Sequence, residues 1–382
     1  MISRKIDFIF FDAGGGHRSA ANALRQVIET QARPWEIRMV NLQEVLDPLD
    51  VLRKSTGVRT QDIYNLLLKK GWTLGASKLL VGMHGIIRLY HPAQVRLLQT
   101  FWEKSRPDMV VSLIPNFNRA LKESLGKVLP KVPVVTILTD LADYPPHFWI
   151  ERQEQFFICG TERAAMQARA TGHQKSGVFQ TSGMILHPRF YEPVRVDRPA
   201  ERARLGLDPH LPTGLVLFGG EGSMVMLEIA RRLDASGLKL QLILICGHNA
   251  ALARRLRALS FRMPVFIEGF TRDLPYYMAL CDFFIGKPGP GSISEALRMG
   301  LPVILERNAW TLPQERYNAD WVVEKQVGMV LPNFRKIDRA VAQVLRPETY
   351  EKFRKNAAAL DNRAVFEIPD ILQRIFSTCE NS

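Results

Sequence analysis

The sequence predicts an α/β protein made of two Rossmann-like domains, each built on a parallel sheet. Short, continuous apolar runs alternate along the chain with amphipathic helical segments, as in strand–helix–strand units. This pattern begins twice, near residue 6 and again near residue 213, each time as a strand, a glycine-rich loop and a helix. The length of 382 residues is enough for two hydrophobic cores. We therefore expect one such domain in each half of the chain.

The first half contains five expected strands. Ile6–Phe11 is a short run that is apolar except for Asp7, which favours a buried parallel strand over a half-exposed one. After a glycine cluster, Arg18–Thr30 carries Ala20, Leu24 and Ile28 on one helical face. The other four expected strands of this half are 109–114, 132–138, 156–159 and 178–181.

The second half repeats this order. Thr213–Phe218 is an expected strand, 219–223 a glycine loop and Val225–Leu233 a helix. The further expected strands are 240–246, 265–268, 282–285 and 302–305. Residues 191–212 are rich in proline and charge and follow no sustained period, so they predict the linker between the halves.

The composition excludes several classes of protein. The hydrophobic fraction of 46% and the charged fraction of 23% are those of a folded globular protein rather than a disordered or low-complexity chain. No apolar stretch approaches the roughly 18 to 20 residues that span a bilayer, and the N-terminus is a poor signal peptide. The four cysteines are far apart and form no C-x-x-C motif, which favours a reducing cytosol and no structural zinc.

The excess positive charge is concentrated in the first half. The chain carries 51 basic and 38 acidic residues. Residues 53–106 contain ten of the basic residues but only two of the acidic ones. More than half of the net charge of +13 thus lies in one seventh of the chain, which predicts an anionic partner. Within this stretch, residues 65–92 mix aliphatic and basic side chains without an acid, as an interfacial surface on anionic lipid would. The residues expected at this membrane surface are Lys69, Lys70, Trp72, Lys78 and Arg88.

Three glycine-rich loops each join an expected strand to a helix. Their candidate ligand-binding residues are Gly14, Gly15 and Gly16 before His17, then Gly219, Gly220 and Ser223, and then Gly289, Gly291 and Ser292. Glycines let a ligand approach the backbone, and a helix N-terminus offers free N–H groups to an anion. None of the loops is a dinucleotide-binding or P-loop motif. They predict a ligand with phosphates and hydroxyls, with tight turns and a helix-cap histidine as the structural alternatives.

Several polar residues follow expected strands or begin expected helices, where ligands of α/β sheets bind. Asp140 follows an expected strand, and Glu295, one turn into a helix, could accept the two hydroxyls of a ribose. The others form the polar cluster Gln314, Glu315 and Asn318, which could bind sugar hydroxyls. Each also suits an ordinary turn or first helical turn. Asp140 and Asp143 are spaced D-x-x-D rather than D-x-D, so we expect no metal site.

The motifs together resemble glycosyltransferase family 28, and within it the branch of monogalactosyldiacylglycerol synthases and diacylglycerol glucosyltransferases. They are D-A-G-G-G-H-R-S-A-A (12–21), T-D-L (139–141), G-G-E-G (219–222), I-C-G-H-N (245–249), G-F (269–270), Y-M-A-L-C-D (277–282) and K-P-G-P-G-S-I-S-E-A (287–296). They occur in the family's order over about residues 6 to 330. The resemblance implies the GT-B fold, with two Rossmann-like domains whose parallel sheets face a central cleft.

The resemblance also implies where the substrates bind. A UDP-sugar would bind mostly to a C-terminal domain, 196–362, with no cofactor required and no metal. Its expected contacts are Gly219, Gly220 and Ser223 for the diphosphate, Gly269 and Phe270 for the uracil, Gly289, Gly291 and Ser292 for phosphate, Glu295 for the ribose, and Gln314 and Glu315 for the hexose. A lipid acceptor would bind to an N-terminal, membrane-docking domain, 1–195, with His17 near its hydroxyl. A final helix, 363–382, would cross back to that domain.

The implied activity is inverting transfer of galactose or glucose from a UDP-sugar to diacylglycerol, giving a β-glycosyl diacylglycerol. His17 is the first candidate for the general base, and Asp140 is the second candidate or the partner that orients His17. The protein would then be cytoplasmic and peripheral at the inner face of the cell membrane.

Alternative functions use the same residues differently. An N-acetylglucosaminyltransferase acting on a polyprenyl-linked or lipopolysaccharide precursor would keep the donor site and change the acceptor. A sugar-nucleotide epimerase of this fold would need no lipid surface, and a non-catalytic lipid- or nucleotide-binding protein would need no base. Nucleic-acid binding is disfavoured, because the basic segment is aliphatic with a single tryptophan rather than interleaved with aromatic residues.

Overall fold

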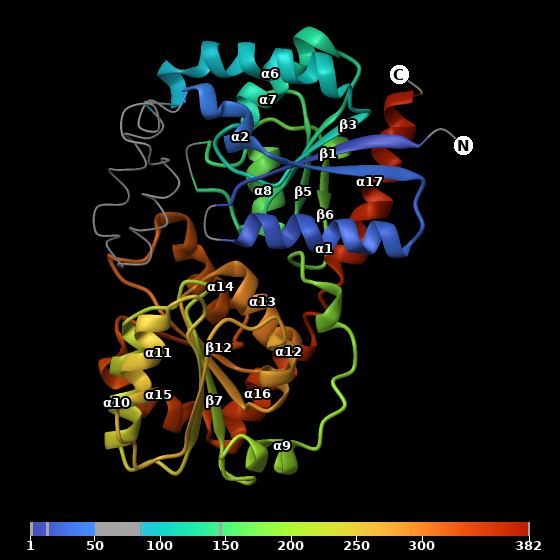
Figure 1. The fold of residues 1–382 in the computed structure, drawn as a ribbon. Helices are drawn as coiled ribbons and strands as arrows, with labels where there is room; N and C mark the ends of the chain where they lie inside the picture. The colour runs from blue at the N-terminus through green and yellow to red at the C-terminus, as the bar shows by residue number, and fades with distance from the viewer. Residues whose placement is uncertain (1–2, 13–14, 50–84, 86, 145–146, 381–382) are drawn as a thin grey trace. The chain divides into compact units, whose positions relative to one another are not determined.

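The chain folds into two compact α/β units in the computed structural model, which describes residues 3–12, 15–49, 85, 87–144 and 147–380 (Figure 1). Unit 1 contains the described residues up to Pro188 and those from Asn362 onward. Unit 2 contains Arg189–Asp361. The expected domain boundary after residue 195 thus lies a few residues inside unit 2.

Unit 1 is built on a sheet of parallel strands in the order β2-β1-β3-β4-β5-β6. Its strands are β1 (Arg4–Phe10), β2 (Trp35–Asn41), β3 (Met109–Ser112), β4 (Val134–Ile137), β5 (Phe156–Cys159) and β6 (Val178–Gln180). Its helices are α1 (Gly16–Thr30), α2 (Leu42–Leu46), α6 (His91–Ser105), α7 (Asn118–Val128), α8 (Glu162–Ala170) and α17 (Ala364–Glu380).

The last helix of the chain, α17, belongs to the core of unit 1. Ile368, Leu372 and Ile375 are buried with Ile6 and Phe8 of β1 in one apolar cluster, together with residues of α1. The opposite face of the sheet packs against α6 and α7. A sheet covered on both faces explains why Ile6 and the residues from Phe8 to the end of β1 are apolar. Asp7, which lies between them, is buried and pairs with Arg38 of β2.

Unit 2 has a second sheet of parallel strands, in the order β12-β11-β10-β7-β8-β9. Its strands are β7 (Thr213–Leu217), β8 (Gln241–Ile245), β9 (Val265–Glu268), β10 (Phe283–Gly286), β11 (Val303–Glu306) and β12 (Gly328–Leu331). Its helices are α9 (Arg198–Arg204), α10 (Val225–Ala235), α11 (Ala250–Arg257), α12 (Leu274–Ala279), α13 (Pro290–Arg298), α14 (Arg316–Glu324), α15 (Ile337–Val344) and α16 (Pro347–Ala358). Apolar clusters fill both faces of this sheet.

The predicted fold class is confirmed, but two strands were not predicted. These are β2 and β12, each at an edge of its sheet. Glu36 and Arg38 interrupt the apolar pattern of β2, and β12 is a strand of only 4 residues that begins with a glycine. The predicted strands and helices agree with the observed ones to within a few residues at their ends.

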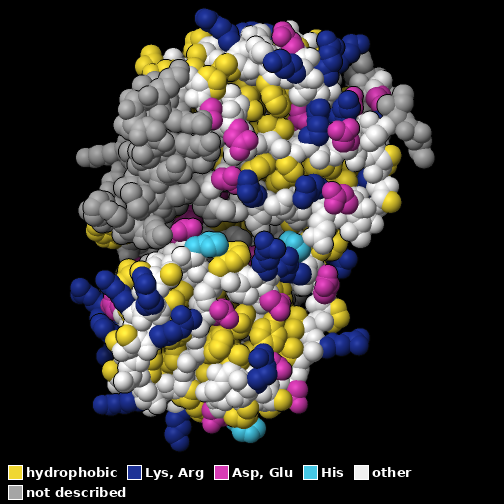
Figure 2. Space-filling model, viewed as in Figure 1, with side chains coloured by type: hydrophobic (Ala, Val, Ile, Leu, Met, Phe, Trp, Pro, Cys, Tyr) yellow, Lys and Arg dark blue, Asp and Glu magenta, His cyan; other side chains and the backbone are white. Residues whose placement is uncertain are grey.

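The surface of unit 2 carries many basic side chains over α10 and α11 (Figure 2). Arg231, Arg232, Arg254 and Arg255 of these helices are exposed. This surface lies outside the basic segment 53–106, and Lys69, Lys70, Trp72 and Lys78 of that segment lie outside the described residues. Among the described helices, none combines the length and hydrophobicity needed to cross a membrane.

Candidate active site

In unit 1, His17 and the loop after β4 come together. His17 is the second residue of α1, and its Nδ1 lies 3.1 Å from the hydroxyl oxygen of Thr139. The helix begins after Gly15, whose φ of +77° suits glycine. The imidazole is therefore tied to a second loop rather than to the start of its own helix. Gly14 lies outside the described residues.

The surroundings of His17 keep its imidazole neutral. Burial lowers the pKa of His17 to about 4, and a hydrogen bond to the backbone of Leu113 opposes this effect. The ring of Trp149 lies beside it, with 6.0 Å between the ring centroids. At pH 7 the imidazole can thus accept a proton, which is the state that a general base requires.

Asp140 is held by the loop that follows it. The indole Nε1–H of Trp149 donates to Asp140 Oδ2 at 2.9 Å, and both side chains are buried. The backbone N–H of Trp149 in turn donates to Asp143 Oδ1 at 2.7 Å. Burial raises the pKa of Asp143 to about 6. Asp143 therefore shapes the loop, while Asp140 and His17 flank Trp149.

In unit 2, the loops after β7 and β8 are packed backbone to backbone. A Cβ placed on Gly247 would lie 2.1 Å from the carbonyl oxygen of Gly220, and Gly247 has a φ of +59°. The N–H of His248 donates to the same carbonyl at 2.8 Å. Gly219 also has a positive φ, of +74°. Gly247 leaves no room for a side chain, and the backbone of Gly219 has a left-handed conformation that favours glycine, so glycine suits both positions.

An exposed aromatic surface adjoins these loops. The ring of Phe270 is stacked on His248, with 4.1 Å between the centroids, and Phe270 is 53% exposed. The N–H of Gly269 donates to Glu268 Oε1, and Tyr277 donates to Glu268 Oε2. Phe270 is thus available to a flat ring such as a base, which is the role that the resemblance implies for it.

The loop after β10 contacts the polar cluster that follows β11. Lys287 Nζ donates to Glu315 Oε1 at 2.9 Å, and the fully buried Asn318 donates to the carbonyl of Pro288 at 2.8 Å. Within the described part of the chain, the buried amide oxygen of Gln314 has no hydrogen-bond partner. The cluster is therefore not a solvated first turn, because Glu315 and Asn318 are buried against the loop after β10.

The two other predicted ligand residues of this loop lie on α13. The hydroxyl of Ser292 donates to the carbonyl of Gly289, and Gly291 is exposed. Glu295 is half-buried one turn further along, and burial raises its pKa to about 7, while the charge of Arg189 lowers it.

Three side chains of these sites were not predicted as functional. Thr139 and Lys287 are the first residues of the motifs T-D-L (139–141) and K-P-G-P-G-S-I-S-E-A (287–296), and this position in a motif could have identified them. Trp149 has no signal in the sequence, because its partners are defined only by the folded loop. Among the described residues, no group of three or more His, Cys, Asp or Glu side chains could hold a metal ion.

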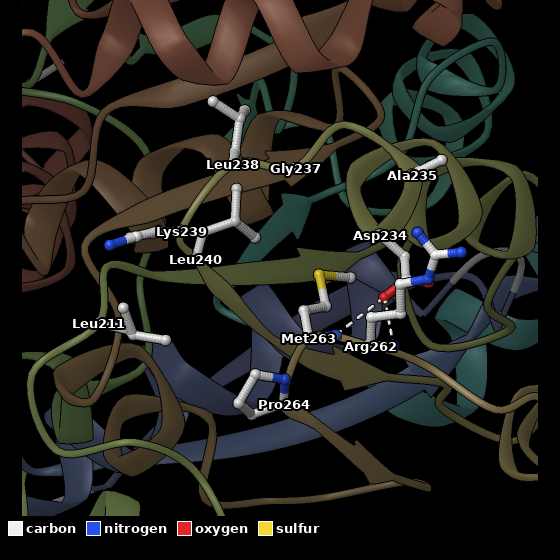
Figure 3. A pocket seen from close by; sticks show the side chains of 10 residues that line it. All are labelled: Leu211, Asp234, Ala235, Gly237, Leu238, Lys239, Leu240, Arg262, Met263 and Pro264. Carbon is white, nitrogen blue, oxygen red and sulfur yellow. Dashed lines mark hydrogen bonds between the residues drawn. The ribbon is translucent and has the colours of Figure 1, made fainter.

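A pocket of about 360 Å³ lies away from these loops (Figure 3). It is lined by the segments that enter β8 and β9, including Lys239 and Met263. Its carboxylate, Asp234, already accepts the backbone N–H groups of Arg262 and Met263. Ligands of parallel α/β sheets bind at the opposite, carboxyl ends of the strands. We therefore do not assign this pocket to the reaction.

Known proteins resemble the chain in sequence and in structure. Residues 215–375 match the glycosyltransferase family 28 C-terminal domain. Monogalactosyldiacylglycerol synthase of Spinacia oleracea is 28% identical over 91% of this chain and 67% of its own length. Monogalactosyldiacylglycerol synthase 1 of Arabidopsis thaliana is 29% identical over 96% of this chain and 70% of its own.

Solved structures show the fold. MurG of Acinetobacter baumannii matches with a TM-score of 0.60 at 10% identity, covering 97% of this chain and 99% of its own. The UDP-GlcNAc 2-epimerase of Neisseria meningitidis matches with a TM-score of 0.62 at 16% identity, covering 97% of this chain and all of its own. A transferase and an epimerase thus share this GT-B architecture, so the fold does not choose between them. The sequence matches favour the transferase, because residues 215–375 resemble the glycosyltransferase family 28 C-terminal domain.

Proposed function

We propose that the protein transfers a hexose from a UDP-sugar to the free hydroxyl of diacylglycerol, with inversion at the anomeric carbon. The observation that carries this is the position of His17 at the start of α1, where its Nδ1 lies 3.1 Å from the hydroxyl oxygen of Thr139. Burial lowers the pKa of His17, so the imidazole can accept a proton at pH 7. Support for the lipid acceptor comes from the names of the relatives, which match over more than nine-tenths of this chain.

The proposed step breaks one bond and forms one. The acceptor oxygen bonds to the anomeric carbon as the bond from that carbon to the β-phosphate oxygen breaks, and UDP takes the electron pair. The hydroxyl proton goes to His17. Because a pKa of about 4 makes His17 a weak base, the proton moves late, when the new C–O bond has made the oxygen acidic. Asp140, which accepts from the indole of Trp149 beside His17, is the carboxylate that we propose to stabilise the imidazolium.

The donor would bind to unit 2 through backbone and side-chain groups. The glycine loops supply N–H groups to the diphosphate, Phe270 stacks on the uracil, and Glu295 accepts the ribose hydroxyls. Gln314 would contact the hexose with the amide oxygen that has no partner in the described residues.

Donor affinity should depend on pH through Glu295. Ionised Glu295 accepts both ribose hydroxyls, and its pKa is about 7. Between pH 8 and pH 6 its ionised fraction falls about tenfold, so the Kd for the UDP-sugar should rise by up to that factor. Calorimetric titration with UDP-glucose or UDP-galactose measures this.

Glu295→Gln is the control for this pH dependence. Its neutral amide should give weak binding that is nearly independent of pH. Glu306, whose pKa burial also raises to about 7, remains in this variant. A pH dependence that persists in Glu295→Gln would assign the effect to Glu306 instead.

The membrane surface remains a proposal based on residues 65–92. Just before α6, the described part of this segment carries the exposed Arg88 beside Leu89, which is 75% exposed. A basic residue beside an exposed aliphatic one suits the lipid interface.

Binding to vesicles of anionic lipid should therefore weaken with added salt and in Lys69→Gln/Lys70→Gln/Lys78→Gln. Each lysine near the surface contributes about 1 kcal/mol, so the triple variant should lose roughly 100-fold in partitioning. The control removes the same charge from exposed lysines of unit 2, in Lys325→Gln/Lys352→Gln/Lys355→Gln. Equal losses of vesicle partitioning in both variants would show that the segment is an ordinary solvated basic face and not a membrane-binding surface.

The function is tested by incubating the protein with radiolabelled UDP-glucose or UDP-galactose and diacylglycerol vesicles. Label in the organic phase is the expected result. Label that enters lipid only with UDP-N-acetylglucosamine and a polyprenyl-linked acceptor would support the alternative transferase. Conversion of the nucleotide sugar without transfer would support an epimerase.

A further inference from the structure

Lys287 lies between two of the glycine loops of unit 2. Its Cε is 3.7 Å from the position that a Cβ would take on Gly219 and 3.5 Å from the corresponding position on Gly289. The first of these glycines follows β7 and the second follows β10, and the two strands are neighbours in the sheet. A single cation therefore stands beside both loops whose backbone is open to a phosphate.

Glu315 fixes the position of this cation. The carboxylate is nearly buried, with 11% of its side chain exposed, whereas 38% of the Lys287 side chain is exposed. An ammonium group has three donor hydrogens, and the bond to Glu315 uses one of them. Lys287 can therefore stay paired with Glu315 and still donate to an anion on its exposed side.

A second contact joins the same two segments. Asn318, with no exposed surface, donates to the carbonyl of Pro288, the residue after Lys287. The segment 313–318 and the loop 287–289 are thus joined twice, by the ion pair and by a buried hydrogen bond from the side-chain amide of Asn318. These two contacts hold Lys287 and the loop in one arrangement before a ligand binds. Such preorganisation lets a group stabilise the charge that develops in the transition state.

We propose that Lys287 is a catalytic residue that contacts the diphosphate of the donor, and that Glu315 is its positioning residue. The inference rests on the proposed function. When the bond from the anomeric carbon to the β-phosphate oxygen breaks, that oxygen takes the electron pair and UDP gains one negative charge. Lys287 offsets this charge without transferring a proton. Glu315 then acts mainly through Lys287 rather than through the hexose that the resemblance implies for it.

The test compares the binding of UDP and UMP to the full chain at pH 8, where both phosphates are fully ionised. Lys287→Met keeps much of the side-chain length and removes the charge. It should weaken UDP binding about 10- to 100-fold, as expected for a lost charge-assisted hydrogen bond, and weaken UMP binding less than threefold. Turnover should fall by about 10² to 10³, and Lys287→Arg should recover part of both losses.

A second variant separates this role from folding. Lys287→Met leaves the nearly buried Glu315 unpaired, so the variant could unfold for that reason alone. Lys287→Met/Glu315→Gln removes both charges and should fold, with the same selective loss of UDP binding. Equal losses of UDP and UMP binding, or unchanged UDP binding and turnover, would overturn the inference. A wild-type protein that binds no UDP would overturn the proposed function and this inference together.

Discussion

His17→Ala lowers kcat by about 10² to 10⁴, which is the usual contribution of a positioned general base. KM for the UDP-sugar stays within about threefold, because His17 is not among the proposed donor contacts. The side chain is only partly buried, so its removal should leave the fold intact. The measurement is steady-state kinetics with the lipid acceptor, together with a thermal melt.

A second histidine of unit 1 provides the matched control. Burial also lowers the pKa of His173, and its ring contacts the backbone of Glu151 and the ring of Phe157. His173→Ala should lower stability and leave kcat nearly unchanged. If His17→Ala keeps kcat and Asp140→Asn loses it, Asp140 is the base and His17 is not.

Gly247→Ala should destabilise the protein by about 2 to 5 kcal/mol and raise the Kd for UDP about tenfold. A left-handed φ costs an alanine about 1 to 2 kcal/mol, and overlap within a packed interior typically adds about 1 to 3 kcal/mol. The new Cβ would overlap the carbonyl oxygen of Gly220 at 2.1 Å, so the loops after β7 and β8 must separate. Urea unfolding and calorimetric titration with UDP measure the two effects.

Gly237→Ala controls for backbone strain. Gly237 has a φ of +72°, close to the +59° of Gly247, but no atom lies within 4 Å of its Cβ position. It follows α10 and borders the pocket at the other end of the strands. Gly237→Ala should cost only the 1 to 2 kcal/mol or so of strain and leave UDP binding unchanged. Similar losses of UDP affinity in both variants would show that the contact between the two loops does not shape the donor site.

The central strands could be predicted because burial on both faces requires continuous apolar runs. The edge strand β2 could not, because Glu36 and Arg38 interrupt its apolar pattern, and β12 could not, because it is only 4 residues long and begins with a glycine. For the site, glycine loops and strand ends are visible in the sequence, and His17 and Glu315 were named as candidates in this way. Their partners were not, because Thr139 is 122 residues from His17 and Lys287 is 28 residues from Glu315. Only the sheet order brings such residues together.

The central claim is inverting transfer of a hexose to a lipid hydroxyl. Proton NMR of the lipid product made from UDP-glucose or UDP-galactose and diacylglycerol tests it most directly, because the donor carries its sugar in the α-configuration. The account predicts one hexose on the free glycerol hydroxyl with the large anomeric coupling of a β-linkage. An α-linked product, or a hexose on any other acceptor group, would contradict it.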